Sequence, residues 1–163
     1  MIEVKIINES NNDTPALATK GSAGVDVRAF IPSPIMLKPL ERKLIPTGLK
    51  VEIPLGYEIQ IRPRSGLAYK NGITVLNSPG TIDSDYRGEI GILLINLSSE
   101  SFEIISGERI AQMVLAKHEL PNFVKQNTLE NSERGEGGFG STCLLYTSPS
   151  PRDQSGSRMP SSA

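Results

Sequence analysis

Short runs in which apolar and polar residues alternate make up most of the chain as far as residue 117. In one such run, Ile59 and Ile61 alternate with Glu58 and Gln60, so the isoleucines should face a core and the polar residues should face outward. Successive side chains of a strand point to opposite faces, so the pattern predicts strands. We expect them over residues 2–8, 24–29, 43–47, 49–53, 57–62, 73–76, 89–97, 101–105 and 109–117.

No long amphipathic helix is evident in the sequence. The best candidate for a short helix is 65–70, which the pair Asn71-Gly72 would end. Prolines punctuate the predicted strands, and the chain has 15 glycines and 12 prolines, which implies many turns. These features predict an all-β domain, a jelly-roll-like β-sandwich or barrel.

Residues 92–95, Ile-Leu-Leu-Ile, are apolar at consecutive positions, so both faces of that strand require burial. A small antiparallel sandwich usually leaves one face of a sheet in water. Two explanations remain open. The strand is either central and covered by loops, or part of a subunit interface.

The amino-acid composition limits which side chains can fill the core and which partners the protein can bind. Aromatic residues make up 5% of the chain and tryptophan is absent, so aliphatic side chains must fill the core. The 17 basic and 18 acidic residues nearly balance, which argues against a general nucleic-acid-binding surface. We expect a soluble, cytoplasmic protein without a membrane partner, because the first residues alternate like a strand and no apolar run approaches the length of a membrane span.

The chain changes character after residue 120. We expect a β domain over 1–120, a flexible, glycine-rich C-terminal arm over 121–142 and a disordered tail over 143–163. The tail looks like the in-frame translation of a transposase-type sequencing adapter, so we interpret it as non-native read-through. A natural low-complexity tail is the alternative.

The segment from Gly80 to Glu89 is the richest in candidate chemistry. It carries four ionisable side chains and a tyrosine, with a predicted strand directly after it. A carboxylate held on a strand or hairpin beside a ring and a guanidinium could activate a water and hold an anionic substrate. Taken alone, however, the segment is better explained as a surface hairpin with solvated charges.

Further candidates each have an ordinary alternative. Asp26 and Gln112 lie in strands that follow turns, where most polar residues are simply exposed. Ser65 follows an arginine at the start of the short helix, where free amides, a hydroxyl and a guanidinium suit a phosphate, unless Ser65 is merely the N-cap. The arm carries an arginine, a phenylalanine and a Ser-Thr pair, which could contact an anion and stack on a ring, or could belong to a linker.

Taken together and in this order, the segments PRSGLA, IDSDYRGE and GGFGST resemble the motifs of the homotrimeric deoxyuridine triphosphatase (dUTP pyrophosphatase, dUTPase) family. The resemblance runs from Ala23 to Thr142. It implies a jelly roll, with sites shared by the three subunits of a homotrimer and closed by the arm, and it favours burial of residues 92–95 between subunits. The implied reaction converts dUTP to dUMP and pyrophosphate, which limits uracil incorporation into DNA and supplies dUMP for thymidylate synthesis.

The resemblance also implies a role for each motif residue. Asp83 would be the general base that activates the attacking water, and Tyr86 would pack its ring under the deoxyribose and exclude a 2′-hydroxyl. Asp26 would support the site near the waters of a metal ion or near the arginine. Uracil would meet Asn77, Gly80, Thr81, Ile82 and Gly91; the phosphates would meet Arg64, Ser65, Gly66 and Gln112; and the arm would add Arg134, Phe139, Gly140, Ser141 and Thr142, with Phe139 stacked on the uracil.

The implied cofactor is Mg²⁺, held by substrate phosphates and water without a direct protein ligand. The sequence contains no His/Cys cluster and no dense group of carboxylates, which suits an ion that keeps several waters. One departure from the family pattern is Cys143, which stands where the arm usually has glycine. A hydrolytically weak enzyme is therefore one alternative.

Two other hypotheses remain. A dCTP deaminase of the same fold family would lack the glycine-rich arm and would use a glutamate on this hairpin, so Asp83 with Tyr86 argues against it. A dUTP-sensing regulatory protein would bind partner proteins; the presence of all the catalytic positions favours turnover without excluding a second binding role.

Overall fold

The computed structural model describes residues 2–138, so the expectations for residues 139–142 of the arm and for the 143–163 tail lie outside the described residues. The described part forms eleven strands and one helix. In chain order these are β1 (Lys5–Asn8), β2 (Gly24–Arg28), β3 (Ile35–Leu37), β4 (Arg42–Pro46), β5 (Leu49–Glu52), β6 (Tyr57–Arg62), α1 (Ser65–Asn71), β7 (Ile73–Val75), β8 (Gly80–Ile82), β9 (Gly91–Asn96), β10 (Phe102–Ile104) and β11 (Arg109–Lys117).

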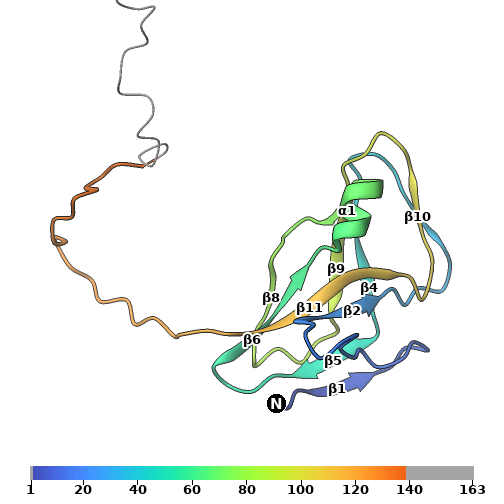
Figure 1. The fold of residues 1–163 in the computed structure, drawn as a ribbon, viewed down its shortest axis with the longest axis horizontal. Helices are drawn as coiled ribbons and strands as arrows, with labels where there is room; N and C mark the ends of the chain where they lie inside the picture. Colours follow the sequence, from blue (N-terminus) through green and yellow to red (C-terminus); the bar gives the residue numbers. More distant parts are fainter. Residues whose placement is uncertain (1, 139–163) are drawn as a thin grey trace, which may run out of the picture. The chain divides into compact units, whose positions relative to one another are not determined.

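The strands pair antiparallel in four groups, ordered β1-β5, β10-β3, β2-β11-β6-β8 and β4-β9-β7. The long strand β11 lies between β2 and β6 (Figure 1). These pairings confirm the prediction of an all-β domain. They also place β8 at the edge of its sheet, with β6 as its one neighbour among the described strands.

The core consists of aliphatic side chains, as the composition predicted. Within residues 2–138, the buried core contains no aromatic ring. The predicted alternation in β6 is confirmed, because Ile59 and Ile61 are buried while Glu58 and Gln60 remain partly accessible. The largest fully buried apolar side chains are Val27, Leu37, Ile45, Ile73, Ile90, Ile92, Leu94, Ile104 and Ile110.

Strand β9 buries one face completely and the other only in part. Ile92 and Leu94 are inaccessible, whereas Leu93 and Ile95 on the opposite face are half-buried. Leu44 of β4 pairs with Leu93 in the register and keeps 65% of its surface exposed. The outer face of the β4-β9-β7 sheet is therefore apolar around Leu44 and Leu93, has Arg42 opposite Ile95, and is incompletely covered by residues 2–138.

Two short strands were not predicted. β3 pairs with β10 in a proline-rich stretch, and β8 pairs with β6 immediately before Asp83. Each directly follows a proline, and each is stabilised by hydrogen bonds to a partner distant in sequence. Because β8 and β9 belong to different sheets, the segment between them is a loop connecting two sheets and not the hairpin that the sequence suggested.

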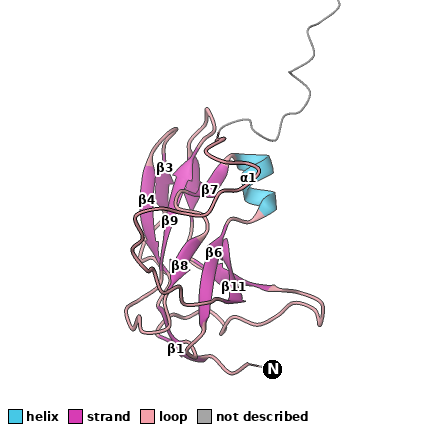
Figure 2. Ribbon diagram, turned by 90° about the vertical axis from the view of Figure 1, so that its left-hand side faces the viewer, coloured by secondary structure: helices cyan, strands magenta, loops and turns pink. Residues whose placement is uncertain are grey.

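Helix α1 is one residue longer than predicted and lies beside β7 (Figure 2). It ends as expected at Gly72, whose left-handed backbone (φ 67°) favours glycine and whose amide donates to Ala68 O and Leu67 O. The N-cap is Arg64, so the alternative in which Ser65 merely caps the helix is wrong.

From Asn122 onward the chain forms a unit of its own, with no helix or strand in residues 122–138. Arg134 Nε donates to Gly137 O at 2.8 Å, which closes a local turn in the arm. Across residues 2–138, no helix is both long enough and apolar enough to cross a membrane.

Candidate active site

The loop from Asp83 to Glu89, called the 83–89 loop below, carries the predicted base and the predicted sugar contact. Asp83 follows β8 directly, and its carbonyl accepts a hydrogen bond from Tyr86 N at 3.1 Å. The two residues are therefore the ends of one tight turn. Tyr86 is 43% exposed, and its hydroxyl donates to Glu89 O at 3.0 Å.

A cavity of about 350 Å³ opens beside this loop. It brings together five residues predicted from the sequence: Thr81, Ile82, Asp83, Tyr86 and Gly91. The same cavity is also lined by residues that the sequence reasoning missed, namely Leu44, Pro46 and Glu89.

Leu44 closes one side of this cavity. A Cβ atom at Gly91 would lie 2.8 Å from Leu44 Cδ1, so the absence of a side chain at position 91 makes room for Leu44. No motif marks Leu44, because it lies 47 positions before Gly91 and meets it through the pairing of β4 with β9. In the sequence Leu44 stands between Lys43 and Ile45 within a predicted strand, and no local signal sets it apart.

The predicted uracil contacts before Asp83 lie close to one another. The Asn77 side chain packs against Gly80, where a Cβ atom would lie 3.2 Å from Asn77 Nδ2. Gly80 is buried opposite Ile61, and Thr81 pairs with Gln60. Because β8 is an edge strand, alternate main-chain amides and carbonyls of this segment point away from β6 and are available to a ligand.

A second group, called the arginine cluster below, consists of Asp26, Arg64 and Arg109. Arg64 Nε donates to Asp26 Oδ1 at 3.0 Å, and Arg109 Nη1 donates to Asp26 Oδ2 at 3.2 Å. Arg64 also donates from Nη1 to Arg109 O at 3.0 Å. The cluster holds two guanidinium groups and one carboxylate, so it keeps one net positive charge for an anion.

The strand register explains why the cluster forms. Gln112 of β11 is paired with Asp26 on one side and with Arg62 on the other, so motifs distant in sequence meet across three strands. The Gln112 side chain donates to Pro63 O at 3.0 Å and thereby holds the chain that leads to Arg64. Gly24 makes this possible, because a Cβ atom there would collide with Gln112 Oε1.

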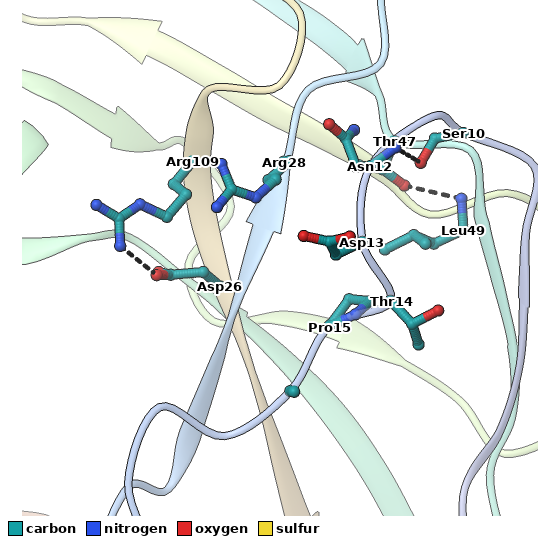
Figure 3. Close-up of a pocket in the computed structure, with 11 residues that line it drawn as sticks. Ser10, Asn12, Asp13, Thr14, Pro15, Asp26, Arg28, Thr47, Leu49 and Arg109 are labelled. Carbon is teal, nitrogen blue, oxygen red and sulfur yellow. Dashed lines mark hydrogen bonds and ion pairs between the residues drawn. The ribbon is translucent and has the colours of Figure 1, made fainter.

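The arginine cluster borders a polar cavity of about 200 Å³ (Figure 3). Asp26, Arg28 and Arg109 line one side, and the loop 10–16 lines the other. Arg28 itself donates to Gly107 O, a contact to the main chain. Asp83 and Tyr86 do not line this cavity.

The 83–89 loop and the residues predicted to contact phosphate lie toward opposite ends of β6. Ile82 is paired with Ile59, so Asp83 lies beyond that end of the register, whereas Arg64 follows Arg62 at the other end. Ile59 and Arg62 alone are separated by about 10 Å at the usual rise of a strand. Ser65 and Gly66 are exposed at the start of α1, away from the cavity of Asp83.

The predicted residues of the arm divide into two sets. Arg134 lies in the unit that begins at Asn122, where its side chain bonds within the local turn. The contacts predicted for Phe139, Gly140, Ser141 and Thr142 lie outside the described residues.

Comparison with known proteins identifies consistent relatives. Residues 10–143 match the dUTPase family. The deoxyuridine 5′-triphosphate nucleotidohydrolase of Cytophaga hutchinsonii is 61% identical over 139 residues, covering 85% of this chain and 90% of the relative. The protein of the same name from Finegoldia magna is 57% identical, with coverage of 86% and 99%.

Solved structures agree with these sequence matches. The dUTPase of Staphylococcus bacteriophage 80alpha with dUpNHpp superimposes with a TM-score of 0.77 at 28% identity, covering 86% of this chain and 98% of that chain. A mutant of the dUTPase from the same phage gives the same TM-score and identity. The likeness supports the jelly-roll-like class predicted for the β domain.

Proposed function

Because this chain belongs to the dUTPase family, we propose that it hydrolyses dUTP to dUMP and pyrophosphate, with the cavity beside the 83–89 loop as the nucleoside end of its active site. The observation that carries this proposal is the single turn that joins Asp83 to Tyr86 and directs both into one cavity. A base and a shape filter for the sugar are thus held at a fixed separation.

Asp83 acts as the general base. Its side chain is exposed at the cavity, so it can orient a water and accept a proton from it as the water attacks the α-phosphate. In-line attack requires that water to lie opposite the leaving pyrophosphate. The gain from such base catalysis is typically about 10²–10⁴-fold, and positioning of substrate and water supplies further acceleration.

Recognition of the nucleoside follows from the edge position of β8. Main-chain groups of Gly80, Thr81 and Ile82 that do not face β6 match the donor and acceptor edge of uracil, with Asn77 beside them. Cytosine would present a donor where uracil has an acceptor and would leave a main-chain group unpaired. The ring of Tyr86 packs under the deoxyribose and leaves no space for a 2′-hydroxyl.

The phosphates are bound by a second group of residues, which includes the arginine cluster. Arg64 is already oriented by Asp26 and by Arg109 O, so it loses little entropy on meeting a phosphate. The remaining contacts in this proposal are Ser65, Gly66 and Gln112 in the β domain and Arg134, Phe139, Gly140, Ser141 and Thr142 in the arm.

We extend the proposal to a homotrimer with shared active sites. The support is geometric, because Asp83 and Arg64 lie beyond opposite ends of β6, and the cavity that holds Asp83 contains none of the phosphate contacts. A second copy can supply the missing half. The apolar outer face of β4-β9-β7, with Leu44, Leu76 and Leu93, is the candidate interface.

The residues present fit a Mg²⁺ ion that is held through the substrate. Residues 2–138 contain no group of three or more His, Cys, Asp or Glu side chains that could enclose a metal. Both oxygens of Asp26 are engaged by arginines, so this carboxylate would reach the ion through water. Such an ion, bound to phosphate oxygens, would polarise the α-phosphate and stabilise the leaving pyrophosphate.

The test is pyrophosphate release from dUTP, dCTP, dTTP and UTP, each with and without Mg²⁺. We expect release from dUTP in the presence of Mg²⁺ and little from the other three nucleotides. Ammonia release from dCTP would instead identify a deaminase and overturn the proposal. Analytical ultracentrifugation of the same preparation tests the trimer separately, and a monomer that turns over dUTP would refute the shared site.

A further inference from the structure

Glu89 connects the 83–89 loop to a different part of the fold. Its Oε1 accepts hydrogen bonds from Gly48 N at 2.7 Å and from Thr47 N at 3.1 Å, in the turn between β4 and β5. The turn depends on Gly48, whose φ of +70° is a left-handed conformation. One carboxylate oxygen therefore satisfies two main-chain donors that are 41 and 42 positions away.

The next residue reinforces this attachment. Thr47, which is almost completely buried, donates from Oγ1 to Ile90 O at 2.6 Å. Ile90 N donates to Leu49 O at 2.8 Å. The end of the loop is thus held on the β4–β5 turn by both a side chain and the main chain.

The same residue also holds Tyr86. The Tyr86 hydroxyl donates to Glu89 O, and the outer end of the ring lies over Gly88, where a Cβ atom would collide with Tyr86 Oη. Tyr86 N is bonded to Asp83 O at the other end of the loop. Tyr86 is therefore held at its main-chain amide by Asp83 and at its ring hydroxyl by Glu89.

We propose that Glu89 is a positioning residue, which sets the pose of the Tyr86 ring and thereby the preference for deoxyribose over ribose. The proposal rests on the proposed function of this cavity. The Glu89 carboxylate accepts hydrogen bonds from the amides of Thr47 and Gly48. It thereby fixes the Glu89 carbonyl, which accepts the hydrogen bond from the Tyr86 hydroxyl. Its task is to accept two hydrogen bonds, so a neutral acceptor of the same shape can perform it.

Replacing Glu89 by alanine leaves two amides without their acceptor and releases the carbonyl that holds Tyr86. We expect the ratio of kcat/KM for dUTP to that for UTP to fall about tenfold, the scale of losing one or two hydrogen bonds. Glu89→Gln keeps an Oε1 acceptor in the same place, and we expect it to retain the wild-type ratio within about threefold.

The experiment measures kcat and KM for dUTP and UTP in the full chain for wild type, Glu89→Ala, Glu89→Gln and Tyr86→Phe. Glu103→Ala, which alters an exposed glutamate of β10, is the matched control and should leave the ratio unchanged. Tyr86→Phe removes the hydroxyl without disturbing the anchor, and should lower the ratio in the same direction. The double variant Glu89→Ala/Tyr86→Phe should lower the ratio by less than the product of the two single effects. Both substitutions weaken the same connection, the hydrogen bond from the Tyr86 hydroxyl to the anchored Glu89 carbonyl.

Binding of dUDP and UDP, measured by calorimetry in the same variants, separates this proposal from the proposed activity. A wild-type protein that prefers dUDP without hydrolysing dUTP would refute the activity alone, and loss of that preference in Glu89→Ala would still support positioning. A folded Glu89→Ala protein with the wild-type preference would overturn the proposal. The proposal would also be overturned if Glu89→Gln were as impaired as Glu89→Ala, because the negative charge of Glu89 would then be required. An unchanged dUTP-to-UTP ratio in Tyr86→Phe would overturn it as well.

Discussion

The 83–89 loop and the arginine cluster are held in place by different kinds of interaction. In the loop, hydrogen bonds involving main-chain groups fix Asp83, Tyr86 and Glu89 relative to one another and to the β4–β5 turn. In the cluster, the carboxylate of Asp26 holds the side chains of Arg64 and Arg109 directly.

This difference suits the two ends of the proposed substrate. A nucleoside is recognised by shape and by individual donors and acceptors, which rigid main chain presents well. A triphosphate is recognised by charge, and the cluster retains one net positive charge after its internal pairing. Substitutions in the loop should therefore alter chemistry and selectivity, whereas substitutions in the cluster should alter phosphate binding and its dependence on salt.

The largest effect is expected at Asp83. Asp83→Asn removes the base and keeps the size of the side chain, so kcat for dUTP should fall by about 10²–10⁴-fold while the dissociation constant of dUTP changes little. Stopped-flow or steady-state pyrophosphate release together with calorimetry measures both quantities. Asp85→Asn, two positions along the same loop, is the control; a near-normal kcat in Asp83→Asn would remove Asp83 as the base.

The next largest effect is expected at Asp26. Asp26→Asn removes the anion that orients both arginines, so kcat/KM for dUTP should fall roughly tenfold to a hundredfold through misplaced phosphate contacts. The loss should appear mainly in KM and should grow with added salt. Asp13→Asn, which alters an exposed carboxylate of the neighbouring cavity, should have little effect. If Asp26→Asn changed dUTP:UTP selectivity instead, the division between the two regions would be wrong.

A smaller effect is expected at Leu44. Leu44→Ala removes one wall of the cavity beside Gly91, so KM for dUTP should rise about three- to tenfold with kcat nearly unchanged. Leu55→Ala, which alters a leucine that is more exposed and lies away from the cavity, controls for loss of apolar surface. An unchanged KM in Leu44→Ala would place the nucleoside elsewhere in the cavity.

The smallest effect is expected at the ion pair between Lys5 and Glu52, which lies beside Arg87 of the 83–89 loop. Lys5 and Glu52 form an ion pair at 2.8 Å beside Arg87, with 67% and 48% of their side chains exposed. Lys5→Ala should leave kcat/KM unchanged and shift the melting temperature by less than about 3 °C, because exposed ion pairs contribute little. A large fall in kcat/KM would show that the loop depends on charge as the cluster does.

The stabilisation contributed by the ion pair between Lys5 and Glu52 changes with pH in a defined direction. The hydrogen bond from Lys5 lowers the pKa of Glu52, so its small stabilising contribution is present above the unfolded pKa of Glu52. The contribution is lost as the pH falls through the lowered pKa. Thermal melts of wild type and Lys5→Ala between acidic and neutral pH should therefore converge at the acidic end.

Regular elements were predicted well where the alternation was long. The bounds of β6 and β11 are those expected from the sequence, and α1 differs by one residue. β3 and β8 were not predicted, because each directly follows a proline and is defined by a partner distant in sequence, whereas the equally short β7 and β10 lie within longer predicted runs. For the same reason the loop after β8 was expected to be a hairpin.

The candidate site was predicted in part. Asp83 and Tyr86 were identified because they share one short motif, and the structure places them at one cavity. Leu44 and Pro46 were missed because they reach that cavity through strand pairing. Glu89 is the last residue of the motif but received no role from it, because its attachment to Thr47 and Gly48 has no counterpart in local sequence.

The sequence by itself determined the all-β class, the aliphatic core, the order of the motifs and the residue types that could perform the chemistry. Those properties depend on local periodicity and on side-chain composition, which a linear chain displays directly. The tertiary structure decided which motifs meet. Strand register joins Asp26, Arg64 and Arg109 into one cluster, and β6 separates that cluster from Asp83 within the chain. The physical reason is that hydrogen-bond pairing and core packing act between residues that are distant in sequence.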